Sequence, residues 1–254
     1  MSKYIYNHIP DPVDERDHKF SIVHAPAVLP SHFDLRPLHN VPAILDQQNL
    51  GSCAPNEISE AMKYCLKEEG TNVFQPARLY IYYFARLLDG SSVEEDTGIT
   101  IRSGLKSIQQ YGVCGETYLP YDISKFRDKP SSECLAIGKY HKNIQYLRVS
   151  QDLASIKHCI YSKSPVIIGI SVYESLEAEE TLKTGVIPLP DVSNEQLLGG
   201  HCVSLYSYDD SARVFGMMNS WGTSVGQSGW FTIPYDYILN PQLCSDLWCI
   251  KYFK

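Results

Sequence analysis

The stretch ILDQQNLGSCAPNEISEAM, residues 44–62, contains a single cysteine at the point where a helix should begin. Ser52 suits the N-cap position, and Pro55 is tolerated because it falls in the first turn. Gly70 is typical of a helix end. Apolar residues with helical spacing fill the interval between these signals: Ala54, Ile58, Ala61, Met62, Cys65 and Leu66. The stretch therefore predicts a helix that begins at Cys53 and ends at Gly70.

Two interpretations of Cys53 compete. It is either a small buried residue beside a turn or a thiolate nucleophile at the positive end of a helix. A free thiol has a pKa of about 8.5, so only a small fraction of it is ionised at neutral pH. A neighbouring imidazolium stabilises the thiolate. The nucleophile interpretation therefore requires a histidine in a constrained setting and a third group that orients it.

One of the eight histidines has such a setting. His201 follows two glycines and opens the run HCVSLYSY, which predicts a strand that would fix the direction of the imidazole. His141 and His158 lie in charged or helical surroundings and have no orienting partner. The other five lie in the polar N-terminal region, where we expect surface residues: His8, His18, His24, His32 and His39.

The segment MMNSWG, residues 217–222, offers the orienting group. Asn219 would hydrogen-bond the His201 ring without adding charge, and Trp221 would shield that bond from water. Taken alone, the segment is explained more simply as a strand end with a capping Asn and a core Trp. Together with Cys53 and His201, the catalytic interpretation is favoured.

A cysteine that attacks a carbonyl group also needs hydrogen-bond donors for the negative charge that develops on the oxygen. Gln47 lies six residues before Cys53, across a turn that contains Gly51. Its side-chain amide and the Cys53 backbone N–H would form a pair of donors. Gln48 is adjacent, and the residues alone do not choose between the two glutamines.

Composition limits the remaining function classes. The chain has 254 residues, of which 44% are hydrophobic, enough for one large domain or two packed lobes. Its net charge of -7 argues against a nucleic-acid partner. No apolar run suits a transmembrane helix and the N-terminus has no secretory signal, so we expect an intracellular protein without a membrane partner.

The eight cysteines predict neither a metal site nor a disulfide framework. No C-x-x-C pair with the spacing of structural zinc occurs, and we expect no metal and no cofactor. Cys65, Cys159 and Cys202 lie in apolar contexts and are predicted to be core residues. We expect mostly reduced thiols, while pairing of Cys244 with Cys249 stays open.

The pattern of apolar residues along the chain changes near residue 143, from helical spacing to short β-rich runs. Helical patterns continue over residues 76–88 and 101–111, whereas the second half contains short β-rich runs over residues 164–173, 201–209, 213–222 and 229–238. This pattern predicts an α+β fold with two lobes and a cleft between them. Residues 1–30 have no sustained periodicity, which is typical of an extension that lies on a domain.

These residues together resemble the sequence motifs of a known family. Gln47-x-x-x-Gly51-Ser52-Cys53, Gly200-His201 and Asn219-Ser220-Trp221-Gly222 are similar to the motifs of the papain-like, or cathepsin-like, cysteine peptidases. The order Cys, His, Asn and the 148-residue separation of Cys53 from His201 agree with that family. The resemblance runs from about Leu35 to Tyr237.

The resemblance implies a helical left lobe, a β-barrel-like right lobe and a substrate cleft between them. It assigns Cys53 as the nucleophile, His201 as the paired acid and base and Asn219 as its orienter, with Trp221 in support. It also selects Gln47 over Gln48 as the oxyanion donor. The resemblance further implies that the segment Asp96–Arg102 binds substrate. The main chain of Gly98 and Ile99 would pair with the substrate, while Thr100 and Ile101 would line the pocket for the second residue before the cut. Gly200 would be a further substrate-binding residue.

Two departures favour a bacterial and viral branch of the family. Leu50 replaces the half-cystine that familiar members have three residues before the nucleophile, which fits a reducing compartment. The N-terminal region is also too short for the usual helical propeptide and resembles a short leader. We therefore expect a leader over residues 1–30, which as a hypothesis blocks the cleft, and a peptidase domain over residues 31–254. That domain would be mainly helical to about residue 142 and mainly β from about residue 143.

The resulting prediction is a cysteine endopeptidase made as a zymogen, which hydrolyses peptide bonds through a thiolate–imidazolium pair and a thioester. Two alternatives stay open: an acyltransferase or deamidase with the same chemistry, and a non-catalytic protein that binds a partner in the cleft. The expected partner is a peptide or protein substrate, and a monomer is the family's default. Association with a virion is a second hypothesis for location.

Overall fold

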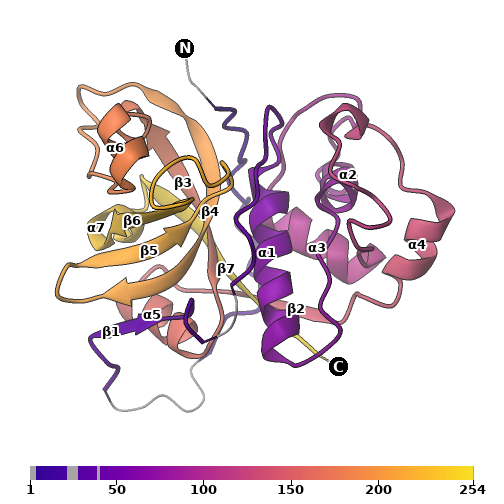
Figure 1. Cartoon of the computed structure of the whole chain (residues 1–254), viewed down its shortest axis with the longest axis horizontal. Helices are drawn as coiled ribbons and strands as arrows, with labels where there is room; N and C mark the ends of the chain where they lie inside the picture. The colour runs from indigo at the N-terminus through magenta and orange to yellow at the C-terminus, as the bar shows by residue number, and fades with distance from the viewer. Residues whose placement is uncertain (1–3, 22–27, 39–40, 254) are drawn as a thin grey trace.

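We describe the protein from a computed structural model, which covers residues 4–21, 28–38 and 41–253. Two lobes lie side by side, one built from helices and one from an antiparallel sheet (Figure 1). The longest helix, α1 (Cys53–Glu68), lies at the junction of the two lobes. The predicted α+β fold with two lobes is confirmed.

The helical lobe contains most of the first half of the described chain. After α1 come α2 (Arg78–Leu88), α3 (Ile101–Tyr111), the short 3-10 turn η1 (Ile123–Lys125) and α4 (Ser132–Gly138). The predicted helix over residues 101–111 is confirmed at both ends. The first helix begins at Cys53 as predicted and ends two residues before Gly70, which adopts a positive φ of 59°.

The second lobe is formed around one sheet with the strand order β2-β7-β3-β4-β5-β6, and β1 pairs with β4. The strands are β1 (His32–Asp34), β2 (Ile144–Arg148), β3 (Val166–Tyr173), β4 (Leu197–Asp209), β5 (Val214–Met218), β6 (Trp230–Pro234) and β7 (Cys244–Tyr252). The helices of this lobe are α5 (Leu153–Tyr161), η2 (Glu174–Leu176), α6 (Glu179–Thr184) and α7 (Tyr235–Leu239). The early strand β1 thus pairs with the sheet of the later lobe.

Each lobe has its own apolar core, and β7 contributes to both. Trp248 and Ile250 pack in the helical core, whereas Leu247 and Cys249 pack in the core of the sheet lobe. This alternation follows from the period of two in a strand, whose successive side chains point to opposite faces. From α1, Tyr64 joins the sheet core while Ile58 joins the helical core. The elements at the junction therefore join the two lobes through apolar contacts on both faces.

The structure differs from the expectations for residues 235–239, for the Ser52 cap and for His8. The β-rich run over residues 229–238 is wrong in its second half, because Tyr235–Leu239 forms the helix α7 after Pro234. Ser52 occupies the N-cap position but makes no capping hydrogen bond with its side chain. His8 is buried at 7% exposure, so its predicted surface position is wrong, whereas His18 and His32 are exposed. His24 and His39 lie outside the described residues.

All eight cysteines, Cys244 and Cys249 included, are free and buried thiols. Among the described residues, no helix combines the length and the apolar character that a membrane span requires.

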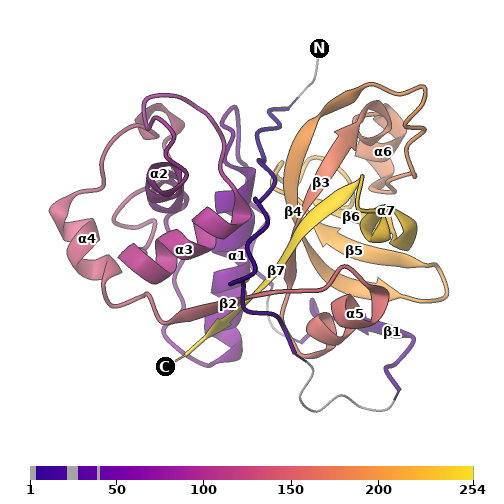
Figure 2. The same cartoon turned by 180° about the vertical axis from the view of Figure 1, so that it is seen from behind.

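The N-terminal segment passes through the junction of the two lobes (Figure 2). We call its described part, residues 4–21, the leader. Its main chain pairs on one side with the sheet lobe, through the bridge of Asn7 with Gly200, and on the other side with the helical lobe, through the bridge of His8 with Ile99. The leader then continues along β2, where Lys19 forms a bridge with Arg148.

A buried arginine on α2 fixes the loop that carries Gly98. The fully buried Arg86 donates hydrogen bonds to the carbonyl groups of Val93, Glu95 and Phe126, and its guanidinium lies over the Tyr82 ring. The Tyr82 hydroxyl in turn accepts the Gly98 N–H at 3.1 Å. These contacts satisfy the carbonyl groups of a loop that has no regular partner strand among the described residues.

We predict that Arg86→Met lowers the free energy of unfolding by about 3 kcal/mol, because it leaves several buried carbonyl groups without a donor. Urea unfolding followed by circular dichroism measures the change. The matched control is Arg127→Met, which removes an exposed guanidinium from the same region and should change the free energy by less than about 0.5 kcal/mol. Equal effects of the two substitutions would contradict this role of Arg86.

Candidate active site

Cys53 is the first residue of α1 and lies against the sheet lobe. Its side chain is 1% exposed, and its sulfur contacts the backbone N–H groups of Ala54 and of Cys202. Cys202 follows His201 directly on β4. The start of α1 and the strand that carries His201 therefore meet at the sulfur.

His201, Asn219 and Trp221 form one packed group. The Nε2 atom of His201 lies 2.8 Å from the Asn219 Oδ1 atom, and the indole of Trp221 stacks on the imidazole with 5.0 Å between ring centroids. All three side chains are at most 4% exposed. The Nδ1 atom of His201 has no hydrogen-bond partner among the described residues. The amide thus orients the ring through Nε2 and leaves Nδ1 available for proton transfer.

Gln47 belongs to a segment that pairs with the loop after β5. Its N–H donates to the Ser220 carbonyl at 2.8 Å, and its Oε1 atom accepts the Ser220 hydroxyl at 3.0 Å. These bonds leave the Nε2 atom of Gln47 to donate to the carbonyl oxygens of Leu50, at 3.1 Å, and of Ile5 in the leader, at 3.2 Å. Gln48 has a positive φ of 55°, and its N–H bonds Asp46. Of the two glutamines, Gln47 is the one whose side-chain amide reaches the cleft.

Glycines on both walls make room for the leader main chain. A side chain at Gly98 would overlap the Asn7 carbonyl, and Gly98 also has a positive φ of 72°. On the other wall, a Cβ atom at Gly200 would lie 2.5 Å from the His8 carbonyl oxygen. The N–H of His8 donates to the Gly200 carbonyl at 2.9 Å, and the N–H of Ile9 to the Ile99 carbonyl at 3.3 Å. Both walls thus bind an extended peptide through main-chain atoms.

Thr100 and Ile101 have contacts of a different kind. The Thr100 hydroxyl caps α3, where it accepts the Ser103 N–H and bonds Asp89. Ile101 is fully buried in the core of the helical lobe. Their predicted part in a substrate pocket stays a prediction. Leu50, at the position of the absent half-cystine, is buried at 2% exposure.

Burial shifts the pKa values of Cys53 and of His201 in opposite directions. It raises the pKa of the Cys53 thiol to about 12, although N–H contacts from Cys202 and Ala54 oppose the rise. Burial likewise lowers the pKa of His201 to about 4, although the hydrogen bond that its ring donates to the Asn219 Oδ1 atom opposes this change. Both groups are therefore neutral at pH 7 with the leader bound. Burial also raises the pKa of Glu57, one turn after Cys53, and a negative charge on this carboxyl would raise the pKa of the Cys53 thiol further.

Two polar side chains fix the turn before Cys53. Arg78 from α2 donates to the Asn56 side chain at 2.8 Å and to the Asp46 carbonyl at 3.1 Å, so it joins the first turn of α1 to the segment of Gln47. The Asp96 carboxylate accepts the Gly51 N–H at 2.9 Å. Asp96 therefore joins the turn before Cys53 to the wall that contains Gly98.

We did not predict from the sequence which residues of the leader would lie in the cleft. Tyr4 stacks on Trp221 with 3.9 Å between centroids, and the Tyr6 ring meets the His201 ring edge-on at 5.6 Å. His8 fills a space beside Gly169, 3.4 Å from the Asp246 carboxylate. The signal was present: Tyr4, Tyr6 and His8 alternate, as side chains on one face of an extended segment do.

No group of three or more His, Cys, Asp and Glu residues in the described chain is arranged to hold a metal ion.

Comparisons with known proteins agree with this geometry. The model of the papain family of cysteine proteases matches residues 29–244. The chain is 37% identical, over 238 residues, to a peptidase C1-like protein of Acanthamoeba polyphaga mimivirus, covering 89% of this chain and 76% of that protein.

Solved structures share the fold. Xylellain, a cysteine protease from Xylella fastidiosa, superposes with a TM-score of 0.89 at 36% identity, covering 98% of this chain and 96% of that one. A digestive procathepsin L 3 from the larval midgut of Tenebrio molitor gives a TM-score of 0.74 at 17% identity, covering 98% and 77% of the two chains, and supports the fold alone. The family model matches most of this chain, and the chain therefore belongs to the papain family of cysteine proteases.

Proposed function

We propose that this cysteine protease is an endopeptidase made as a zymogen, in which Cys53 and His201 form the reacting pair and the leader blocks the cleft. The observation that carries the proposal is the packed group of His201, Asn219 and Trp221 on the strand that meets the start of α1. An amide partner orients the ring without adding charge, which suits a thiolate–imidazolium pair.

The reaction follows from these roles. The Cys53 sulfur attacks the peptide carbonyl carbon, and the C–N bond breaks as His201 transfers its proton to the leaving amine. A thioester remains. His201 then takes a proton from water, the resulting hydroxide attacks the thioester, and the C–S bond breaks to release the acid and the thiolate. Gln47 Nε2 and the Cys53 N–H stabilise the oxyanion in both steps, a contribution of about 3 to 4 kcal/mol per donor.

The leader supports the role of Gln47. Its side-chain amide donates to a peptide carbonyl, that of Ile5, in the part of the leader that lies in the cleft. A donor aimed at a bound peptide carbonyl is the geometry that an oxyanion donor requires.

The burial of the reacting groups supports the zymogen. With the leader in the cleft, Cys53 and His201 are 1% and 0% exposed, and the Tyr4 ring covers Trp221. A substrate would have to displace residues 4–9 to reach the sulfur. The neutral thiol and neutral imidazole of this state are also the unreactive protonation forms.

We predict that loosening the leader creates peptidase activity. The full-length variant Tyr4→Ala/Tyr6→Ala/His8→Ala, here called the leader-loosened variant, should cleave a fluorogenic peptide library in reducing buffer at least about 100-fold faster than the unmodified chain, because it loses both ring contacts and the His8 side chain. A chain that begins at Leu29 should behave similarly.

The controls separate the possible outcomes. Cys53→Ala in the leader-loosened variant should abolish cleavage, while Cys65→Ala, a buried cysteine three turns later on α1, should retain it. Equal activity with and without an intact leader would keep the peptidase and refute the zymogen. Rapid alkylation of Cys53 without any cleavage would refute the endopeptidase and favour acyl transfer, deamidation or binding.

We also predict how the reactivity of Cys53 depends on pH. In the unmodified chain its pKa is raised to about 12, so the thiolate fraction is very small at pH 7 and the rate of alkylation by iodoacetamide should rise about tenfold per pH unit from pH 7 to 10. In the leader-loosened variant, a thiolate–imidazolium pair should make the rate nearly constant over about pH 6 to 8. Mass spectrometry of the Cys53 peptide measures both rates. A plateau near pH 8.5 in the unmodified chain would contradict the buried neutral thiol.

A further inference from the structure

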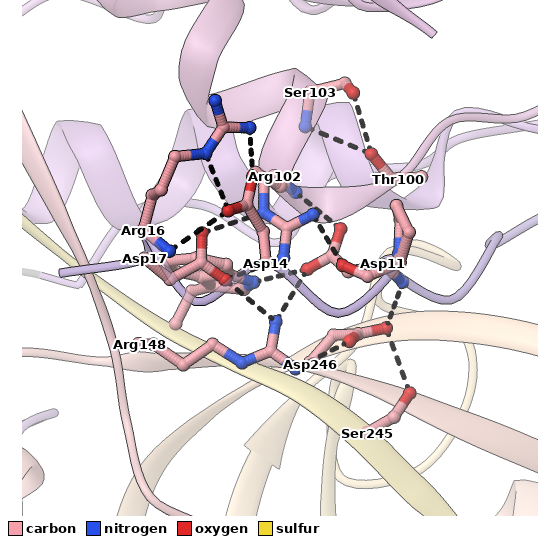
Figure 3. Close-up of polar contacts among 12 residues, drawn as sticks. Asp11, Asp14, Arg16, Asp17, Thr100, Arg102, Ser103, Arg148, Ser245 and Asp246 are labelled. Atoms are coloured by element: carbon pink, nitrogen blue, oxygen red, sulfur yellow. Dashed lines mark hydrogen bonds and ion pairs between the residues drawn. The ribbon is translucent and has the colours of Figure 1, made fainter. Parts of the chain in front are cut away.

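A carboxylate of the leader is held by three donors from the body of the protein. The Asp11 Oδ1 atom accepts the backbone N–H of Arg102 at 3.0 Å, in the first turn of α3 (Figure 3). Its Oδ2 atom accepts two hydrogen bonds, one from the Trp248 indole N–H at 2.7 Å and one from the Arg148 Nη1 atom at 3.0 Å. The Asp11 side chain is 0% exposed. The donors come from α3, β2 and β7, and so from both lobes.

Without the leader, the indole N–H of Trp248 and the Nη1 atom of Arg148 lose the acceptor that Asp11 provides. Trp248 is fully buried, and its indole N–H has Asp11 as its hydrogen-bond partner among the described residues. Arg148 uses its other terminal nitrogen, Nη2, to bond Asp246 at 3.1 Å, which leaves Nη1 for a ligand. A buried donor without a partner costs about 1 to 3 kcal/mol, so the emptied position favours a new acceptor.

The charges of the body also favour an anion. Within this cluster the leader contributes Asp11 and Asp17, which pair with Arg148 and Arg102. When the leader leaves, the body retains the two arginines against one carboxylate, that of Asp246. The net charge of these groups therefore changes from one negative charge with the leader to one positive charge without it.

Asp246 defines the other side of this position. It lies in a bulge of β7, where two residues stand opposite one residue of β3, and it adopts a positive φ of 56°. Its Oδ2 atom accepts the Asp11 N–H at 2.9 Å and lies 3.4 Å from His8. The carboxylate of Asp246 opposes that of Asp11, and together with burial it raises the pKa of Asp11.

We infer that Arg148, Trp248 and the N–H of Arg102 form a carboxylate-binding subsite of the cleft, filled by Asp11 in the zymogen and, after leader displacement, by an Asp or Glu side chain of the substrate. The inference rests on the proposed peptidase function. The subsite lies next to the wall of Gly98 and Ile99, because Asp11 follows the leader residues 8 and 9 that hydrogen-bond the two walls.

Substrate profiling tests the subsite. The full-length leader-loosened variant with Asp11→Asn added, which weakens refilling of the site by the leader, is assayed with peptides that vary up to five positions on either side of the cut. We expect kcat/KM for Glu to exceed that for Gln about tenfold or more at one of these positions. Arg148→Met should abolish this ratio. Asp246→Asn should increase it, because it removes the opposing charge.

The opposite signs of these two effects distinguish a binding role from general damage to the fold. A matched control is Glu177→Gln, since Glu177 accepts the Tyr6 hydroxyl elsewhere in the cleft and should leave the ratio unchanged. A preference for Lys or Arg at the same position that Asp246→Asn abolishes would overturn the inference, as would a Glu-to-Gln ratio near one.

A second measurement does not depend on peptidase activity. In the otherwise unmodified chain, Asp11→Asn should raise the rate of Cys53 alkylation at least about fivefold, because it removes a charge-assisted contact of the leader. Asp14→Asn is the matched control, since Asp14 pairs with Arg16 within the leader. Arg148→Met should raise the rate similarly, and adding Asp11→Asn to it should have little further effect. Independent, additive effects would overturn the subsite even if no peptide were cleaved.

Discussion

The contact between the start of α1 and β4 is the constraint on which the site depends. Cys53 comes from the helical lobe and His201 from the sheet lobe, and the Cys53 sulfur contacts the backbone N–H of Cys202, the residue that follows His201. Apolar packing on both faces of the junction fixes this contact, through Tyr64 of α1 and Trp248 of β7. The segment of Gln47 crosses the same junction to pair with Ser220. The cleft thus lies where the two cores meet, and both lobes contribute chemistry to it.

The leader contacts the features that we propose to bind a substrate. Glycines at positions 98 and 200 let a main chain approach both walls, and the leader makes main-chain hydrogen bonds to each of them. The Ile5 carbonyl accepts from Gln47, and Asp11 fills a position with three donors. Burial in the structure with the leader in place raises the pKa of Cys53 and lowers that of His201. In the function that we propose, one segment obstructs the cleft and also favours the unreactive protonation states.

The sequence predicted the local elements better than the contacts across the cleft. The helix at Cys53 follows from apolar periodicity and turn residues, which are local signals. Selection of Gln47 over Gln48 required the family resemblance, because the difference lies in the pairing with Ser220, which is distant in sequence. His8 was expected at the surface because its neighbours are polar. It is buried because the neighbours that decide its exposure, Gly169 and Asp246, are brought to it only by folding.

The most direct test of the account is residue-resolved amide hydrogen exchange, followed by NMR, on the full-length chain with Cys53→Ala. The N–H groups of His8 and Ile9 donate to opposite walls of the cleft, so both should exchange at least about 100-fold more slowly than in an unstructured peptide. The leader-loosened variant should lose this protection. Exchange of both amides at unstructured-peptide rates in the Cys53→Ala chain would mean that the leader does not occupy the cleft, and would contradict the account.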